Sequence, residues 1–292
     1  MSGLLAGKKG AGLRVEVGAR SDVGMVRRNN EDSFTVELPL SLLILCDGMG
    51  GQAAGEVASK LAVSVIREHC RQAARNPLLA IKGENREEFA PQTNRLASGI
   101  RLSNDAIREA AESNAAQTGM GATVVAARIL DHVLSIAHVG DSRIYLFREG
   151  TLQQVTQDHS LVMEQVRKGM ITLEEAEHHK MSSIIMRALG AEPTVKVDLD
   201  EIWVNEGDQV LLCSDGLTRM VSDEGIAQVL AEAETAQRAA DRLVEIANDN
   251  GGEDNVTVIV ARLKPPERWT VWKAFIRLFA GGNRHGQADS QV

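Results

Sequence analysis

The stretch Leu42-Leu43-Ile44-Leu45-Cys46-Asp47-Gly48 is an apolar run that ends in an acid and a glycine. Comparable runs end at Gly140-Asp141 and at Asp215-Gly216, and a further acidic pair, Glu253-Asp254, follows two glycines. Runs of four to seven mostly apolar residues bounded by turn residues predict buried β-strands. The chain is therefore expected to place several acids at the ends of buried strands.

These acids predict a particular kind of site. A carboxylate at the end of a buried strand is unfavourable unless it is paired or bound to a metal ion. If the strand ends converge, the acids form a cluster of like charges that requires cations. Oxygen-only clusters suit the hard ions Mg²⁺ and Mn²⁺ rather than zinc. The pattern thus predicts a divalent-metal site.

The composition narrows the class of protein. The chain has 292 residues, of which 43% are hydrophobic and 25% charged, as in an ordinary soluble globular protein. A net charge of −8 disfavours a general nucleic-acid-binding role. Cys46, Cys70 and Cys213 form no CxxC pair, so neither a disulfide framework nor a zinc knuckle is expected, and a cytoplasmic location fits. No stretch reaches the roughly 20 apolar residues of a membrane span.

The hydrophobic periodicity predicts an α+β fold. Strand patterns cover 13–17, 33–45, 122–130, 133–139, 143–147, 152–156, 195–199, 209–213 and 256–263. Helical patterns cover 57–69, 96–111 and 222–248, a polar helical stretch covers 157–190, and a loop is expected at 76–94. The strands of 122–156 predict an antiparallel meander. The whole predicts a central antiparallel β-sandwich flanked by pairs of antiparallel helices, in α-β-β-α layers.

The first helical pattern also predicts a buried face. Val57, Leu61, Val65, Ile66 and His69 recur at helical spacing, with alanines between them. We expect this face to pack against the sheet.

The two ends of the chain differ from its middle. Residues 1–12 are rich in glycine and are expected to form a flexible N-terminus. Residues 264–292 carry five Lys or Arg against two Asp or Glu, with Trp269, Trp272 and Phe275 at helical spacing. This pattern predicts a basic amphipathic C-terminal tail, which binds a membrane surface or a partner protein, packs on its own domain, or is partly disordered.

The acids stand within motifs that resemble a known family. In chain order the motifs begin as Asp22-Val23-Gly24 with Arg27-Arg28-Asn29-Asn30-Glu31-Asp32, Cys46-Asp47-Gly48-Met49-Gly50-Gly51, Gly119-Met120-Gly121-Ala122-Thr123 and His138-Val139-Gly140-Asp141-Ser142-Arg143. They continue as Asp158-His159-Ser160, Arg187-Ala188-Leu189-Gly190, Ser214-Asp215-Gly216-Leu217 and Glu253-Asp254-Asn255-Val256-Thr257. In this order they resemble the metal-dependent type 2C (PPM) serine/threonine protein phosphatases, bacterial type, with 13–263 as the catalytic domain.

The resemblance implies a dinuclear Mn²⁺ or Mg²⁺ centre that activates a water for the hydrolysis of phosphoserine and phosphothreonine. Asp47 would bridge both ions, and the backbone carbonyl of Gly48 would bind one of them. Asp215 and Asp254 would complete the second ion's site. Asp141, together with Asp215, resembles the pair of acids that holds a weaker third ion in bacterial relatives; the alternative for Asp141 is a turn acid.

The first motif would supply further parts of the site. Glu31 and Asp32 would act through waters or on the ligands themselves. Arg27 would bind the substrate phosphate, because a guanidinium group makes bidentate hydrogen bonds to phosphate oxygens. Arg28 is the alternative for that role.

Several positions depart from the family pattern. Met49 stands where animal relatives carry a histidine proposed to protonate the leaving alcohol, and a thioether cannot donate a proton. Arg219 stands where many relatives have Asp or Asn, and a cation there should weaken a third metal site. His159 is expected to order its loop, and 163–186 corresponds to the family's mobile flap, which would gate substrate access.

The favoured hypothesis is an active phosphatase that acts on phosphorylated proteins, opposes a bacterial Ser/Thr kinase and exists as a monomer. One alternative is a catalytically inactive relative that acts as a phosphoprotein-binding adaptor, but the expected metal ligands Asp47, Gly48, Asp215 and Asp254 are all present. A switch phosphatase dedicated to one regulator protein is a further alternative. A Ca²⁺-binding β-module is disfavoured, because its acids would lie in one loop and not be spread over the chain.

Overall fold

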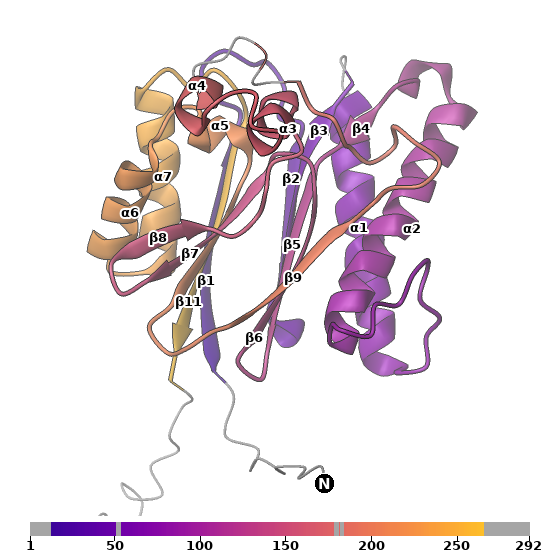
Figure 1. The fold of residues 1–292 in the computed structure, drawn as a ribbon, viewed down its shortest axis with the longest axis horizontal. Coiled ribbons are helices and arrows are strands. Elements are labelled where there is room, and N and C mark those ends of the chain that lie inside the picture. Colours follow the sequence, from indigo (N-terminus) through magenta and orange to yellow (C-terminus); the bar gives the residue numbers. More distant parts are fainter. Residues whose placement is uncertain (1–12, 51–53, 178–180, 182–183, 266–292) are drawn as a thin grey trace, which may run out of the picture.

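Two antiparallel sheets packed face to face form the centre of the computed structural model, which describes residues 13–50, 54–177, 181 and 184–265 (Figure 1). One sheet has the order β1-β11-β10-β7-β8, and the other has the order β2-β3-β5-β6-β9 with β4 beside β3. The strands are β1 Arg14–Asp22, β2 Asp32–Glu37, β3 Leu42–Met49, β4 Gly121–Ala122, β5 Val124–Leu130, β6 Val133–Val139, β7 Arg143–Arg148, β8 Thr151–Gln154, β9 Asp198–Trp203, β10 Gln209–Cys213 and β11 Val256–Lys264.

Helices cover the outer face of each sheet (Figure 1). Helices α1 and α2 pack on the β2–β3 sheet, and α6 and α7 pack on the β1–β11 sheet. The helices are α1 Ala54–Arg75, α2 Pro91–Ser113, α3 Leu161–Arg167, α4 Leu173–Glu177, α5 Asp215–Thr218, α6 Asp223–Glu232 and α7 Ala236–Asp249. The predicted α-β-β-α layering of an α+β fold is thus confirmed.

Strand β3 shows why its sequence is a continuous apolar run. Leu42 and Ile44 point into the core beneath α1 and α2, whereas Leu43 and Leu45 point into the core between the two sheets. Because successive side chains of a strand lie on opposite faces and both faces are covered, no position can be polar until the strand reaches its end. The acid Asp47 comes at that end.

The predicted buried face of α1 is wrong in part. Ile66 and His69 are buried, but Val57 is exposed, and Leu61 and Val65 are only partly buried. Most of the buried positions are small residues, chiefly alanines, such as Ala58 and Ala62. Their size lets α1 lie close to both β3 and α2, so the wider apolar side chains are displaced towards the edges of the contact.

The predicted meander is also wrong in part. Strands β5 and β6 pair in one sheet, and β7 and β8 pair in the other, so that the chain crosses the sandwich at Gly140-Asp141. A glycine with a φ of 108° stands at this crossing. A turn dipeptide predicts that the chain reverses, but it does not say which sheet receives the next strand. The crossing leaves Asp141 between the two sheets.

Other boundaries move by a few residues. Strand β9 begins at Asp198, three residues later than predicted, and α2 begins at Pro91 inside the predicted loop. Within 157–190, only α3 and α4 are helical among the described residues. Strand β11 runs through Lys264, whose ammonium group pairs with Glu16. The predicted flexible N-terminus, 1–12, and the tail from 266 onwards lie outside the described residues.

Candidate metal centre

Five acids gather at one end of the sandwich. Asp32 begins β2 and lies directly opposite Asp47 of β3 in the register of the sheet. From the other sheet, Asp215 is the first residue of α5 after β10, and Asp254 comes two residues before β11. Asp141 lies at the crossing between β6 and β7. The strand ends thus converge, which is the condition that the predicted divalent-metal site required.

The pKa values of these acids express their proximity. Burial raises the pKa of Asp32 to about 7, and the like charges of Asp215 and Asp254 act in the same direction. Burial and the charge of Asp215 likewise raise the pKa of Asp141 to about 7. Burial, followed by the charge of Asp32, raises the pKa of Asp47 well above its usual value. Without a bound cation, these acids are not readily ionised all at once, because their negative charges repel one another.

Three of the carboxylates have an oxygen atom that no hydrogen bond satisfies. The Oδ1 atoms of Asp32, Asp141 and Asp215 are buried and have no partner among the residues that the structure describes. Buried acceptors without partners are rare in folded proteins because each costs free energy. An oxygen-lined cluster of this kind fits Mg²⁺ or Mn²⁺, and the donor set contains no thiolate or imidazole that would favour zinc.

Gly48 brings the backbone close to the acids. Its N–H donates a hydrogen bond to the carbonyl oxygen of Glu31, at 3.2 Å. A Cβ on Gly48 would lie 2.7 Å from that same oxygen and closer still to the carbonyl oxygen of Gly55 in α1. Only glycine fits where β3, the Glu31 segment and the start of α1 meet. The Glu31 side chain itself lies against Gly55.

Arg27 lies at the edge of the cluster. Its Nη2 atom is 2.7 Å from Oδ2 of Asp254, and about half of its side chain is exposed. The loop before it is fixed by hydrogen bonds from the N–H groups of Met25 and Val26 to the carbonyl oxygen of Gly252, at 2.8 and 3.3 Å. Arg28, the alternative phosphate-binding residue, is exposed. A guanidinium group that is exposed yet held beside the acids suits an incoming phosphate.

Two polar residues that sequence reasoning did not select connect the parts of the centre. Ser214 Oγ donates a hydrogen bond to Asp32 Oδ2 at 2.8 Å and so joins the two sheets. Asn255 Oδ1 accepts from the N–H of Glu31 at 2.8 Å, and its Nδ2 donates to the carbonyl oxygens of Val23 and Asn29. The only signal in the sequence is that each residue adjoins an acid of a motif.

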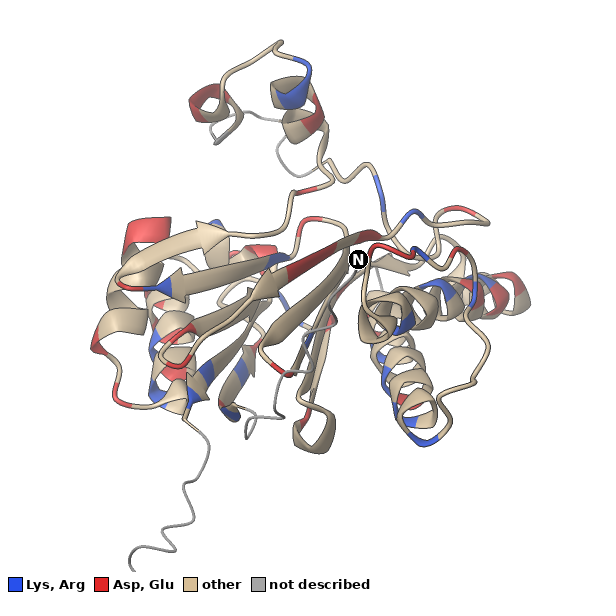
Figure 2. Ribbon diagram, turned by 60° about the horizontal axis from the view of Figure 1, so that its bottom comes forward, with Lys and Arg blue, Asp and Glu red and all other residues tan. Residues whose placement is uncertain are grey.

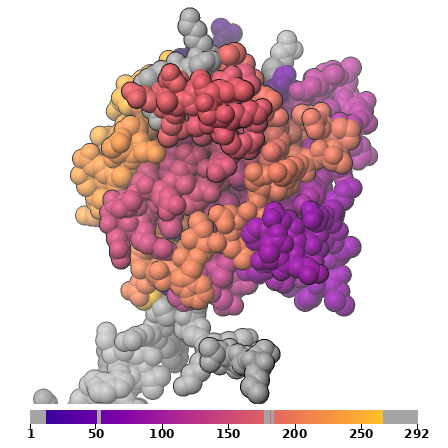
Figure 3. Space-filling model, viewed as in Figure 1, coloured from indigo at the N-terminus to yellow at the C-terminus, as the bar shows by residue number. Residues whose placement is uncertain are grey.

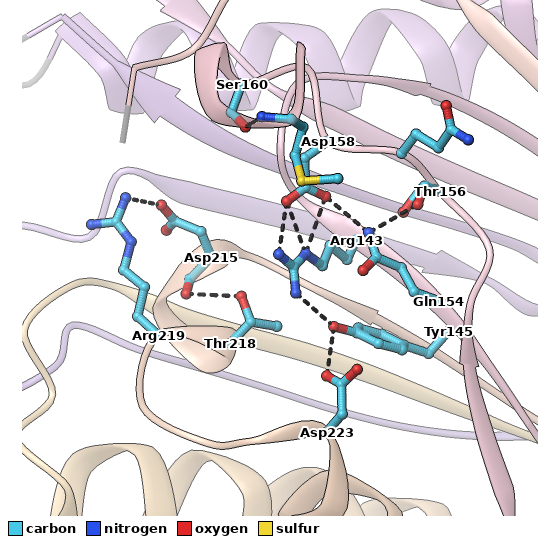
Figure 4. A network of polar contacts seen from close by, with 12 residues as sticks. Arg143, Tyr145, Gln154, Thr156, Asp158, Ser160, Asp215, Thr218, Arg219 and Asp223 are labelled. Atoms are coloured by element: carbon cyan, nitrogen blue, oxygen red, sulfur yellow. Dashed lines mark hydrogen bonds and ion pairs between the residues drawn. The ribbon is translucent and has the colours of Figure 1, made fainter. Parts of the chain in front are cut away.

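A third missed group lies near Asp215 (Figure 4). The Nε and Nη2 atoms of Arg143 make a bidentate contact with Asp158, at 3.1 and 2.8 Å, and Nη1 donates to the hydroxyl of Tyr145 at 2.9 Å. The Tyr145 hydroxyl donates in turn to Asp223. The charge of Arg143 also lowers the pKa of Asp215, against the larger effect of burial. This network holds the guanidinium of Arg143 near Asp215 of the centre.

A second group of potential ligands is structural. His138, His159 and Asp198 lie within ligand distance of one another, but Arg187 Nη1 donates to Asp198 Oδ1 at 2.8 Å and supplies the positive charge there. His159 Nδ1 accepts from the N–H of Gly140 at 3.0 Å. The prediction that His159 orders its loop is therefore confirmed.

The segment predicted as a flap lies at the same end as the acids. Figure 2 shows its short helices as a lobe that projects from the sandwich, and Figure 3 shows its surface above the sheets. The lobe is attached at its base, where the N–H of Met186 donates to the carbonyl oxygen of His159 and that of Leu161 to Ile184. Of the predicted flap, 178–180 and 182–183 lie outside the described residues.

The fold and the centre define a class of protein. Acids from both sheets of an α-β-β-α sandwich, arranged to hold divalent ions beside an arginine, are the setting of a metal-dependent phosphatase. Residues 26–259 match the family of protein phosphatase 2C. The chain belongs to this family of metal-dependent serine/threonine protein phosphatases.

Individual relatives agree with this assignment. The chain is 43% identical to the serine/threonine protein phosphatase PstP of Mycobacterium tuberculosis over 250 residues, which cover 85% of this chain but 45% of PstP. It is 38% identical to the serine/threonine phosphatase stp of Listeria innocua over 244 residues, 82% of this chain and 93% of stp. The structure of the PstP catalytic domain in complex with two manganese ions aligns with a TM-score of 0.72 at 39% identity, covering 87% of this chain and 100% of that domain. The chain thus spans about half the length of PstP.

None of the described helices is long and apolar enough to cross a membrane.

Proposed function

We propose that this chain hydrolyses phosphoserine and phosphothreonine esters in proteins with the help of two Mn²⁺ or Mg²⁺ ions. The observation that carries the proposal is the cluster of five acids beside an exposed arginine, in which three buried oxygen atoms have no partner within the described part of the chain. Divalent cations are the groups that such a cluster of like charges requires. The names of PstP and stp, both serine/threonine phosphatases, support this substrate class.

We assign the metal ligands from the positions of the acids in the cluster. Asp47 would hold both ions, the carbonyl of Gly48 one of them, and Asp215 with Asp254 the other. When bound, the ions polarise phosphoryl oxygens and make hydroxide available near neutral pH. We propose Asp141 as the acid of a third, weaker site.

The remaining residues orient the ligands and the substrate. Glu31 and Asp32 act on the ligands or through water, since Asp32 is held by Ser214 and lies directly opposite Asp47. When substrate binds, the guanidinium of Arg27 moves from Asp254 to the phosphate group. Two parallel hydrogen bonds then hold the phosphate in position for in-line attack. We propose that the flap admits or excludes the substrate peptide.

The test is hydrolysis of p-nitrophenyl phosphate and of a phosphothreonine peptide with Mn²⁺, with Mg²⁺ and with EDTA. We expect metal-dependent turnover that Asp215→Asn abolishes without unfolding the protein, because the change removes a ligand charge and little volume. The matched control is Asp105→Asn, which alters an acid of α2 that pairs with Lys82 at 2.8 Å, outside the cluster, and should retain turnover. Folded protein without turnover in any metal would favour the adaptor hypothesis.

The setting of this activity is also a proposal. We propose that the chain opposes a bacterial Ser/Thr kinase, acts as a monomer and works in the cytoplasm, which its three free, buried cysteines support. We propose 13–263 as the catalytic domain and 264–292 as a separate basic tail that binds a membrane surface or a protein. A chain ending at Lys264, which keeps β11 whole, should retain turnover of p-nitrophenyl phosphate.

A further inference from the structure

A second arginine, Arg219, pairs with Asp215 of the centre (Figure 4). It follows α5 directly, and its N–H donates to the carbonyl oxygen of Asp215 at 2.9 Å, so the two side chains stand one helical turn apart. Its Nη2 atom pairs with Asp215 Oδ2, and its Nη1 atom lies 3.8 Å from Asp254 Oδ2. An acid four residues before a base is the favourable order on a helix.

The position of Arg219 is therefore set by the backbone of α5. Oδ2 of Asp254 is the atom that Arg27 also contacts, so two guanidinium groups converge on one edge of the cluster. The guanidinium thus compensates negative charge at two of the five acids, Asp215 and Asp254.

We propose that Arg219 is a built-in cation that competes with the divalent ion at the Asp215–Asp254 edge of the centre. This inference rests on the proposed function, because it concerns the same ion site. The guanidinium stabilises the metal-free protein by pairing with acids that otherwise repel one another. The same positive charge repels an incoming ion. The guanidinium must also give up part of its contact with Asp215 and Asp254 when the ion binds, so Arg219 lowers the affinity for that ion.

The two effects have opposite signs, and this distinguishes the proposal from a merely structural role. An arginine that only supports the fold would lower stability with or without metal when it is replaced. A competing cation, when it is replaced, lowers the stability of the metal-free protein but strengthens metal binding. At saturating Mn²⁺ the tighter binding offsets the loss.

The experiment compares Arg219→Gln with the unaltered full chain by calorimetric titration of Mn²⁺ and by thermal unfolding in EDTA and in excess Mn²⁺. We expect the Mn²⁺ site of Asp215 and Asp254 to bind about fivefold more tightly in Arg219→Gln, the scale of a partly exposed ion pair. We also expect a lower midpoint in EDTA and no loss in excess Mn²⁺. Arg219→Lys, which keeps the charge, should resemble the unaltered chain, and Arg219→Ala serves if the Gln variant does not fold.

The matched control is Arg71→Ala. Arg71 pairs with Glu37 at 2.7 Å, and the side-chain exposures of 41% and 14% nearly equal the 38% and 14% of Arg219 and Asp215. Because this pair lies outside the cluster of acids, its loss should leave Mn²⁺ affinity unchanged. Unchanged or weaker Mn²⁺ binding by Arg219→Gln, in a chain that otherwise binds Mn²⁺, would overturn this inference alone. No Mn²⁺ binding by the unaltered chain would overturn the proposed function, and the inference with it.

Discussion

Asp32→Asn should stabilise the metal-free protein at pH 8 while it impairs the metal-dependent activity. Asp32 is 7% exposed, and its Oδ1 atom has no partner among the described residues. Asparagine keeps the shape of the side chain, and its Oδ1 atom can still accept the hydrogen bond from Ser214. The substitution therefore removes a poorly solvated negative charge with little other change.

The size of the effect follows from the pKa of Asp32, which burial raises from 3.8 to about 7. Below pH 3.8 the carboxyl group is protonated in the folded and unfolded states, so it imposes no penalty. Between pH 3.8 and about 7 the unfolded chain releases the proton and the folded chain retains it, and folding stability falls as the pH rises. About three pH units, at 1.4 kcal/mol each, give about 4 kcal/mol at pH 8. This is a large part of a typical stability of 5–15 kcal/mol.

The assay is urea unfolding in EDTA from pH 4 to pH 8, followed by circular dichroism. The curves of the two proteins should coincide near pH 4 and separate towards pH 8, with the variant the more stable. Asp208→Asn is the control of opposite sign, because buried Asp208 binds Arg148 through both oxygens, at 2.9 and 2.6 Å, and its neutralisation should cost about 1–3 kcal/mol. Equal stabilities of Asp32→Asn and the unaltered chain at pH 8 would refute the reasoning.

Three other changes test separate parts of the centre. Arg27→Ala should raise the Michaelis constant for phosphopeptides at least tenfold, an effect of the order of one charged hydrogen bond, while calorimetric Mn²⁺ affinity changes little; lost Mn²⁺ affinity with an unchanged constant would point to Arg28. Gly48→Ala should lower stability by about 3 kcal/mol or more, measured by urea unfolding, because its Cβ overlaps the backbone of α1 and of the Glu31 segment. Unchanged stability would mean that these backbone segments are not tightly packed around Gly48. Arg143→Met should cost about 3–5 kcal/mol, since it leaves Asp158 charged and unpaired, and an unaltered unfolding midpoint would contradict the assigned network.

The strands were the most predictable part of the fold, for a physical reason. Strand β10 alternates between two cores, with Val210 and Leu212 facing the other sheet and Leu211 and Cys213 facing the helices. Covering on both faces requires a continuous apolar run, which is visible in the sequence. The crossing at Gly140-Asp141 was not predictable, because a hairpin and a crossing between sheets require the same turn residues and differ only in distant packing.

The site divides in the same way. Asp47, Asp141 and Asp215 could be predicted because a carboxylate that ends an apolar run is conspicuous in the sequence, whereas Asp32 was indicated only by the family resemblance. Ser214 and Asn255 could not, because serine and asparagine beside a turn are common, and only the docking of one sheet on the other brings Ser214 to Asp32 and Asn255 to Glu31. The pairing of Arg219 with Asp254 likewise joins residues that are distant in the sequence.

The acids of the centre come from both halves of the sandwich, and this has a consequence for assembly. Asp47 belongs to one sheet, whereas Asp215 and Asp254 adjoin strands of the other, so the proposed ion site exists only after the two sheets have docked. Ions that bind the docked sandwich but not its separated halves stabilise the docked form, and this stabilisation rises with the free ion concentration. A cell short of manganese or magnesium would then lose more than turnover: it would hold a less durable protein, more readily opened and degraded.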